Sequence, residues 1–331
     1  MYHSPKTKEE IAEELGVTLV YIQDRIEFLE GNGFLQKTTG GRFTTYVRFT
    51  PETFSLEMRE NKQKKQLEIA QTLVKEYVPA VREAISGVTE VYIPGGNREL
   101  LEASAIFYGV ANKCRIPICK DLSSYVIKTT DGGEYITFVE LEAEQSDVEY
   151  KATLPSVPYW ACGDMMRISE KYPAVASWSI DTRLCSRQGG WQNNLTADYE
   201  YVYEFLNGFL CDNAANAEKL QRLRERAFLT PDNQINIMMV KERDFFEKIP
   251  PLDDTVKERF AHTALEYAML EAKNYPPQMQ DLVIDWGVGG FIGAVVALMV
   301  MDILYGDGTL RPLTENEKVT SNLIMFSDRI P

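Results

Sequence analysis

The chain has 331 residues, of which 44% are apolar and 25% charged, the balance of an ordinary water-soluble protein of two or three domains. Its formal net charge of −14 repels phosphate, so contact with nucleic acid requires a local basic patch. Five scattered cysteines and two histidines give no zinc or iron–sulfur spacing, so we expect reduced thiols, no metal and no cofactor.

Two short helices are predicted at the start of the chain. Thr7 caps a helix over residues 8–15, with Glu10 in the capping-box position, and a glycine ends it. Thr18 caps a second helix over residues 19–30, whose apolar residues repeat at helical spacing. The tight connection between them predicts a helix-turn-helix.

A hairpin is predicted to follow these helices. Strand-like segments at 34–37 and 42–49 are joined by residues 38–41, which include two glycines. The apolar residues of the helices and the hairpin are expected to form one core: Ile11, Leu15, Ile22, Ile26, Leu29 and Phe34.

Two runs in this region, Thr7–Val17 and Leu29–Leu35, resemble winged helix-turn-helix transcription regulators. The resemblance implies that the second helix enters the major groove of DNA and that the hairpin, the wing, lies along phosphates. A looser resemblance links the chain to the winged helix and C-terminal accessory domain behind extracytoplasmic-function-like sigma factors. The residues expected to contact DNA are Thr18, Tyr21, Gln23 and Arg25 on the helix and Lys37, Arg42 and Arg48 on the wing.

The charge of this region leaves a second hypothesis open. Residues 1–50 contain six Lys and Arg against seven Asp and Glu, whereas a DNA-binding module is normally basic. The first hypothesis is a DNA-binding regulator with a ligand-sensing or oligomerisation domain. The alternative is a winged helix that docks on RNA polymerase or another transcription component.

A complete winged helix has one more helix before the first one seen here, and only six residues precede Thr7. One side of the predicted core therefore needs a cover. The helix after Pro51 could fold back, a second subunit could cover the gap, or the chain could be the tail of a longer protein. We expect the helix after Pro51 to touch this face, with some apolar surface left for a partner.

The remaining chain predicts an α+β fold in two parts. Residues 51–88 read as a long connecting helix interrupted at Pro79, and residues 89–331 as a mixed α+β domain. Helices are expected at 99–112, 197–210, 216–228, 255–274 and after Trp286, strands at 90–94, 175–185 and 235–240, and a hairpin at 125–142.

The large domain contains no GxSxG, P-loop or strand-following GxGxxG motif, so we expect a non-enzymatic role in sensing, dimerisation or partner contact. Aromatic residues gather between residues 159 and 203, which suits either an ordinary core or a small-molecule pocket. The candidate ligand-binding residues are Trp160, Trp178, Arg187, Trp191 and Gln192.

One uncharged stretch, Trp286–Met301, invites comparison with a membrane span. Its sixteen residues fall short of the roughly twenty needed to cross a bilayer, and an aspartate stands at each end. It predicts a buried core helix or, if exposed, an oligomerisation face. The first residues lack the apolar region of a signal peptide, so we expect a cytoplasmic protein without membrane contact.

Overall fold

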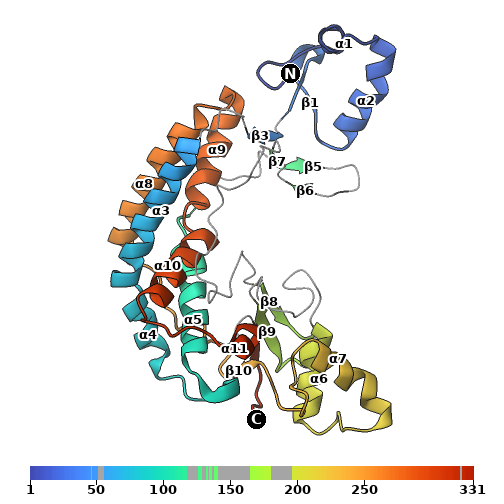
Figure 1. Ribbon diagram of the computed structural model, residues 1–331. Helices are drawn as coiled ribbons and strands as arrows, with labels where there is room; N and C mark the ends of the chain where they lie inside the picture. The colour runs from blue at the N-terminus through green and yellow to red at the C-terminus, as the bar shows by residue number, and fades with distance from the viewer. Residues whose placement is uncertain are drawn as a thin grey trace. The chain divides into compact units, whose positions relative to one another are not determined.

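The computed structural model describes residues 1–45, 47–50, 56–117, 126–128, 132, 134–135, 138–140, 165–179, 196–320 and 323–331. Their fold is mixed α+β, in agreement with the predicted class (Figure 1). The chain divides into two compact units built from interleaved segments. Unit 1 contains residues 1–63, 116–149 and 258–291, and unit 2 contains residues 64–115, 150–257 and 292–331. The domain boundaries suggested at residues 50 and 88 stay predictions.

Unit 1 begins with two helices and a two-stranded antiparallel ribbon, which we call the N-terminal module (residues 1–45). Its elements are α1 (Lys8–Leu15), α2 (Leu19–Gly31), β1 (Gln36–Lys37) and β2 (Phe43–Thr44). The predicted capping box is confirmed: the Glu10 backbone N–H donates to Thr7 Oγ1 at 3.2 Å, and the Thr7 N–H donates to the Glu10 carboxylate at 2.8 Å. Gly16 has the left-handed conformation, with φ of 67°, that ends α1 and allows the tight turn.

The core of the module differs in part from the predicted one. Its buried members are Ile11, Ala12, Ile22, Ile26, Leu35 and Phe43. Leu29 packs on this cluster while partly buried, but Leu15 is 65% exposed and does not belong to it. Met1 and Val17 also pack against this cluster while partly buried. The hairpin supplies Leu35 and Phe43 to this core. The contact expected from the helix after Pro51 stays a prediction.

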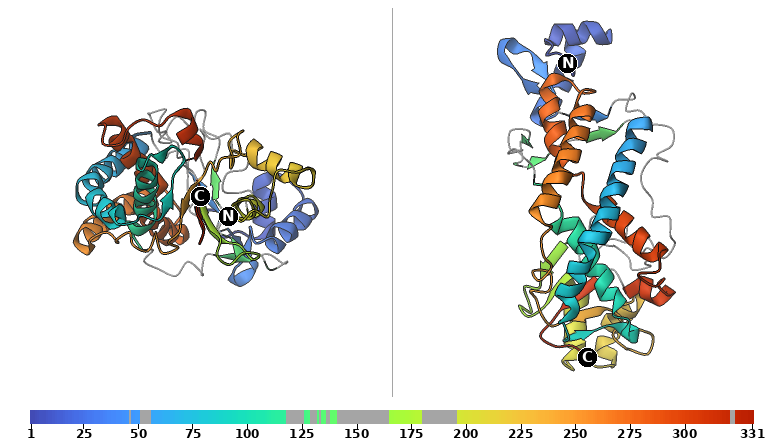
Figure 2. Two further views of the ribbon diagram at one scale, coloured as in Figure 1. Left: turned by 90° about the horizontal axis from the view of Figure 1, so that it is seen from below. Right: turned by 90° about the vertical axis from the view of Figure 1, so that its left-hand side faces the viewer.

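Unit 1 also holds two small sheets and a pair of helices. Strand β3 (Arg48–Thr50) pairs in parallel with β7 (Phe138–Glu140), and β5 (Ile127–Lys128) pairs antiparallel with β6 (Glu134–Tyr135), part of the hairpin predicted at 125–142. Helices α8 (Asp254–Ala272) and α9 (Pro277–Gly289) run side by side (Figure 2). They approach so closely that a Cβ placed on Gly287 would lie 3.0 Å from the Cβ of Ala268.

The predicted connecting helix is two helices, α3 (Leu56–Glu76) and α4 (Val78–Ser86). The chain breaks at Tyr77, and Pro79 lies in the first turn of α4, where a missing N–H costs nothing. The interruption predicted from Pro79 is thus confirmed, although the break falls two residues before it.

Unit 2 is organised around a five-stranded mixed sheet. Its order is β4 (Val91–Tyr92), β10 (Met238–Val240), β11 (Leu323–Phe326), β9 (Ala176–Ser179) and β8 (Met165–Ile168). Only the β10–β11 pair is parallel, and the other three pairs are antiparallel. Strands β8 and β11 were not predicted.

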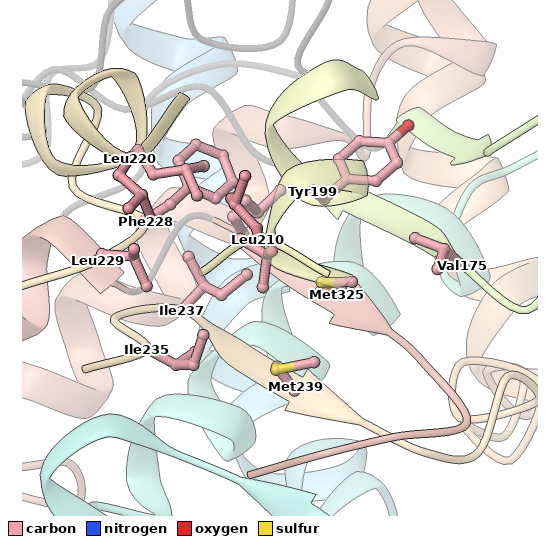
Figure 3. Close-up of a cluster of buried hydrophobic side chains, with 13 residues drawn as sticks. Val175, Tyr199, Leu210, Leu220, Phe228, Leu229, Ile235, Ile237, Met239 and Met325 are labelled. Atoms are coloured by element: carbon pink, nitrogen blue, oxygen red, sulfur yellow. The ribbon is translucent and has the colours of Figure 1, made fainter. Parts of the chain in front are cut away.

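Helices complete unit 2 around this sheet: α5 (Glu99–Tyr108), which continues into a π-helical turn (Gly109–Lys113), α6 (Thr196–Leu206), α7 (Ala217–Glu225), α10 (Ala294–Gly306) and α11 (Glu315–Thr320). One apolar cluster joins α6 and α7 to β10 and β11 through side chains such as Tyr199, Leu220 and Met325 (Figure 3). Helix α10 packs against α5 and buries most of its side chains.

The helical stretch Pro277–Gly306 is long and apolar enough to cross a membrane, by length and composition alone. Within its most apolar window 61% is buried inside the structure. Burial of that extent is typical of the core helix of a water-soluble protein, which is the interpretation favoured by the short uncharged run in the sequence.

Candidate interaction surface of the N-terminal module

The DNA-contact residues predicted on α2 are all exposed, but two of them are engaged within the helix. The hydroxyl of Thr18 accepts the Tyr21 backbone N–H at 3.3 Å as the N-cap. The amide of Gln23 donates to the carboxylate of Glu27 at 3.2 Å. Tyr21 and Arg25 are exposed to solvent. Arg25 is the one positively charged residue among the four predicted to contact DNA from this helix.

Arg42, predicted to lie on phosphates, also braces the module. Its guanidinium forms a bidentate ion pair with the Glu10 carboxylate, with both N···O distances at 2.9 Å, and also donates to the Pro5 carbonyl at 2.8 Å. The backbone hydrogen bond from Thr7, followed by the bond from Arg42, lowers the pKa of Glu10. Arg42 thereby ties the hairpin to the start of α1, and the pairing offsets its charge.

The other predicted wing cations occupy different surroundings. Lys37 lies in β1 and is exposed. Arg48 is not on the hairpin, because its strand β3 pairs with β7 in a separate sheet. Lys6 forms an ion pair with Glu14, and the ammonium of Lys8 lies 6.0 Å from the centre of the Phe43 ring. Within residues 1–45, this leaves Arg25 and Lys37 as the cationic side chains without a described ion pair or ring contact.

Exposed apolar residues are the most prominent feature of α2. Val20 is 81% exposed, Tyr21 63% and Phe28 61%. Leu15 at the end of α1 and Leu19 at the start of α2 are exposed as well. Of these, only Tyr21 is among the residues predicted to contact DNA. Val20 and Phe28 were missed, although they are out of phase with the buried residues Ile22 and Ile26, and that phase difference is the signal in the sequence that could have found them.

A scan against protein-family models, a search of curated proteins and a search of solved structures each found no match for this chain. A functional assignment therefore rests on the residues and their geometry.

Trp178 is the one candidate ligand-binding residue that the structure describes, and the described residues around it do not form a ligand pocket. Trp178 is fully buried in β9, with its ring 4.8 Å from that of Phe246 and 5.9 Å from that of Tyr108. Its indole N–H has no acceptor among the described residues, and the packing is that of a core side chain. Trp160, Arg187, Trp191 and Gln192 lie outside the described residues.

Reactive groups in the described part of the chain are sparse. That part contains no cluster of three or more His, Cys, Asp or Glu side chains placed to hold a metal ion. Burial raises the pKa of the Cys114 thiol to about 12, so this thiol stays protonated at neutral pH. Cys211 is exposed and free, and its Sγ lies 3.1 Å from the Gly208 carbonyl. His262 is exposed on α8, and its Nε2 lies 3.2 Å from Oε1 of Glu266 on the next turn of the helix.

Proposed function

We propose that the N-terminal module is a winged helix-turn-helix and that the protein acts in transcription regulation by docking on a protein through the exposed face of α2. The two capped helices, the turn at Gly16 and the ribbon that shares their core support the winged-helix assignment. The resemblance of Thr7–Val17 and Leu29–Leu35 to regulators of that class supports the role in transcription.

The observation that carries the proposal is the exposure of Val20, Tyr21 and Phe28 together on one short helix. Fully burying an apolar side chain of this size stabilises a complex by roughly 1.5–3 kcal/mol. Aromatic side chains are also enriched among the residues that dominate protein–protein binding. A phosphate backbone offers these side chains nothing comparable.

The charges of α2 favour the same conclusion. Asp24, Glu27 and Glu30 are exposed on this helix beside a single cation, Arg25. Binding to duplex DNA draws much of its free energy from Lys and Arg placed at phosphates. A second candidate function, weak DNA binding, is favoured by the exposure of Arg25 and Lys37, the two cations left outside ion pairs and ring contacts.

Two binding measurements on the full chain separate these functions. The first is binding to purified bacterial RNA polymerase, compared between Phe28→Ala and the control Phe209→Ala, which removes a ring that is 69% exposed in unit 2. We expect only Phe28→Ala to weaken binding, by about tenfold or more, equivalent to ~1.4 kcal/mol. The second measures binding to a labelled random-sequence duplex at low salt.

The second measurement decides between protein and DNA. If the duplex binds tightly while polymerase does not, and Arg25→Ala with Lys37→Ala abolishes duplex binding, the DNA candidate replaces the docking proposal. Failure to bind either target removes both functions for this module.

A further inference from the structure

We infer that the partner surface for α2 is a basic amphipathic helix, with apolar side chains on one face and lysine or arginine beside them. This inference rests on the proposed docking function and specifies the chemistry of the partner. It starts from the arrangement of side chains along the exposed side of α2, where apolar and acidic residues alternate within a short distance.

The apolar part of the surface is a row. Val20, Asp24 and Phe28 are four residues apart, so they follow one line along the helix, and Tyr21 lies beside it. The row from residue 20 to residue 28 is about 12 Å long at 1.5 Å per residue. That length matches two turns of a partner helix, whose anchors at positions i, i+3 or i+4, and i+7 would meet it.

The acidic part of the surface fixes the sign of the partner's charge. Asp24 lies inside the apolar row, and Glu27 and Glu30 lie on the same helix, all three exposed. Asp24 and Glu30 have no ion-pair partner among the described residues. The entire chain carries a net charge of −14, so its long-range field attracts a basic partner and repels an acidic one.

The cations of the module do not compensate this charge on α2. Arg42 is held by Glu10, and Lys6 by Glu14. Arg25 is the one cation of the helix itself, set against three carboxylates. A partner that brings lysine or arginine to the row therefore gains attraction to Asp24, Glu27 and Glu30, and its apolar face gains contact with Val20 and Phe28.

The test uses the full chain and three fluorescein-labelled synthetic peptides of about five helical turns. One has leucine on one face and lysine elsewhere, the second has glutamate in place of lysine, and the third has the leucine and lysine positions scrambled. We expect the basic amphipathic peptide to bind at least about tenfold more tightly than either of the others. Fluorescence anisotropy at several salt concentrations gives each Kd and its salt dependence.

Paired variants locate the binding surface. Phe28→Ala should weaken binding of the basic amphipathic peptide by about tenfold, whereas Phe209→Ala should not change it. Neutralising the three carboxylates of α2 with Asp24→Asn, Glu27→Gln and Glu30→Gln should reduce the salt dependence of binding. The control set Glu83→Gln, Glu218→Gln and Glu247→Gln removes the same charge from exposed sites elsewhere in the chain and should not.

Three results overturn the inference: equal binding of the acidic and basic amphipathic peptides, equal binding of the scrambled peptide, or equal effects of the paired variants. If polymerase binding still depends on Phe28 in that case, the docking function stands and only the chemistry of the partner is wrong. If neither polymerase nor peptide binding depends on Phe28, the docking function fails as well.

Discussion

Replacing Phe43 with alanine should unfold the N-terminal module locally without disturbing unit 2. Phe43 is 1% exposed and is the only aromatic member of the buried cluster formed by α1, α2 and the hairpin. Its backbone is held by two hydrogen bonds with Lys6, at 2.7 and 3.0 Å, so the substitution removes the ring and keeps the strand pairing.

The size of the effect follows from the size of the core. Truncating a buried phenylalanine to alanine costs roughly 3–5 kcal/mol in lost burial and cavity formation. A cluster of six buried side chains cannot distribute that loss widely. A loss of ~3 kcal/mol raises the population of the open module by more than about a hundredfold, at 1.4 kcal/mol for each factor of ten.

Amide hydrogen exchange on the full chain measures this opening directly. Protection of α1 and α2 amides should fall by about a hundredfold in Phe43→Ala, while amides of β10 and β11 keep theirs. Phe43→Leu conserves most of the volume and should cost less than about 1.5 kcal/mol. Unchanged protection in Phe43→Ala, or the absence of protection in the wild-type module, would refute the argument that this core holds the module together.

Three further predictions concern ion pairs and close packing. Arg42→Ala should lower hydrogen-exchange protection of α1, because it removes the bond to Glu10, whereas Lys37→Ala should leave protection unchanged; equal effects would contradict the bracing role. Gly109→Ala should lower the free energy of unfolding by about 1–3 kcal/mol, because the new Cβ would lie 2.9 Å from Tyr77 Oη and 3.2 Å from Ile249 Cγ2. Urea unfolding should show this as a lower midpoint concentration. The control Gly87→Ala, with nothing within 4 Å of the new Cβ, should not. Burial opposes ionisation of Glu317, but hydrogen bonds from Arg311, Thr314 and Asn97 outweigh it and hold its pKa at about 2. Because this folded-state pKa is below the ordinary 4.5, the resulting stability is present above pH 4.5 and is lost as the pH falls towards 2. Thermal melts should therefore show a smaller acid-induced decrease in Tm for Glu317→Gln than for the wild type, and parallel decreases would count against the pairing.

Local signals predicted the helices of the module well. The capping residues Thr7 and Thr18 and the glycine at position 16 act within a few residues, so sequence spacing alone locates the helix ends. The hydrophobic period identified Ile22 and Ile26 as core residues for the same reason.

Features that depend on distant parts of the chain were not predictable in this way. The ion pair of Arg42 with Glu10 was not predicted, because the two residues are 32 positions apart in the sequence. Arg48 was assigned to the wing, but its strand pairs with residues 138–140. No local pattern encodes that distant contact, so the sequence could not reveal it. The strand at 323–326 was missed because it is buried throughout and shows no alternation of polar and apolar residues. Leu15 fits the helical period, but its side of α1 is left uncovered.

The position of β11 in the sheet has a consequence for the order of folding. This strand lies between β10 and β9, and it comes from residues 323–326, whereas β4 lies at residues 91–92. Until β11 has been synthesised, the sheet exists as two separate pairs, β4 with β10 and β9 with β8. Closing it requires contacts across long stretches of chain, which fold slowly and leave strand edges open during synthesis. A nascent chain stalled before β11 would thus expose unpaired edges of β10 and β9, the surfaces through which partly made sheet proteins aggregate.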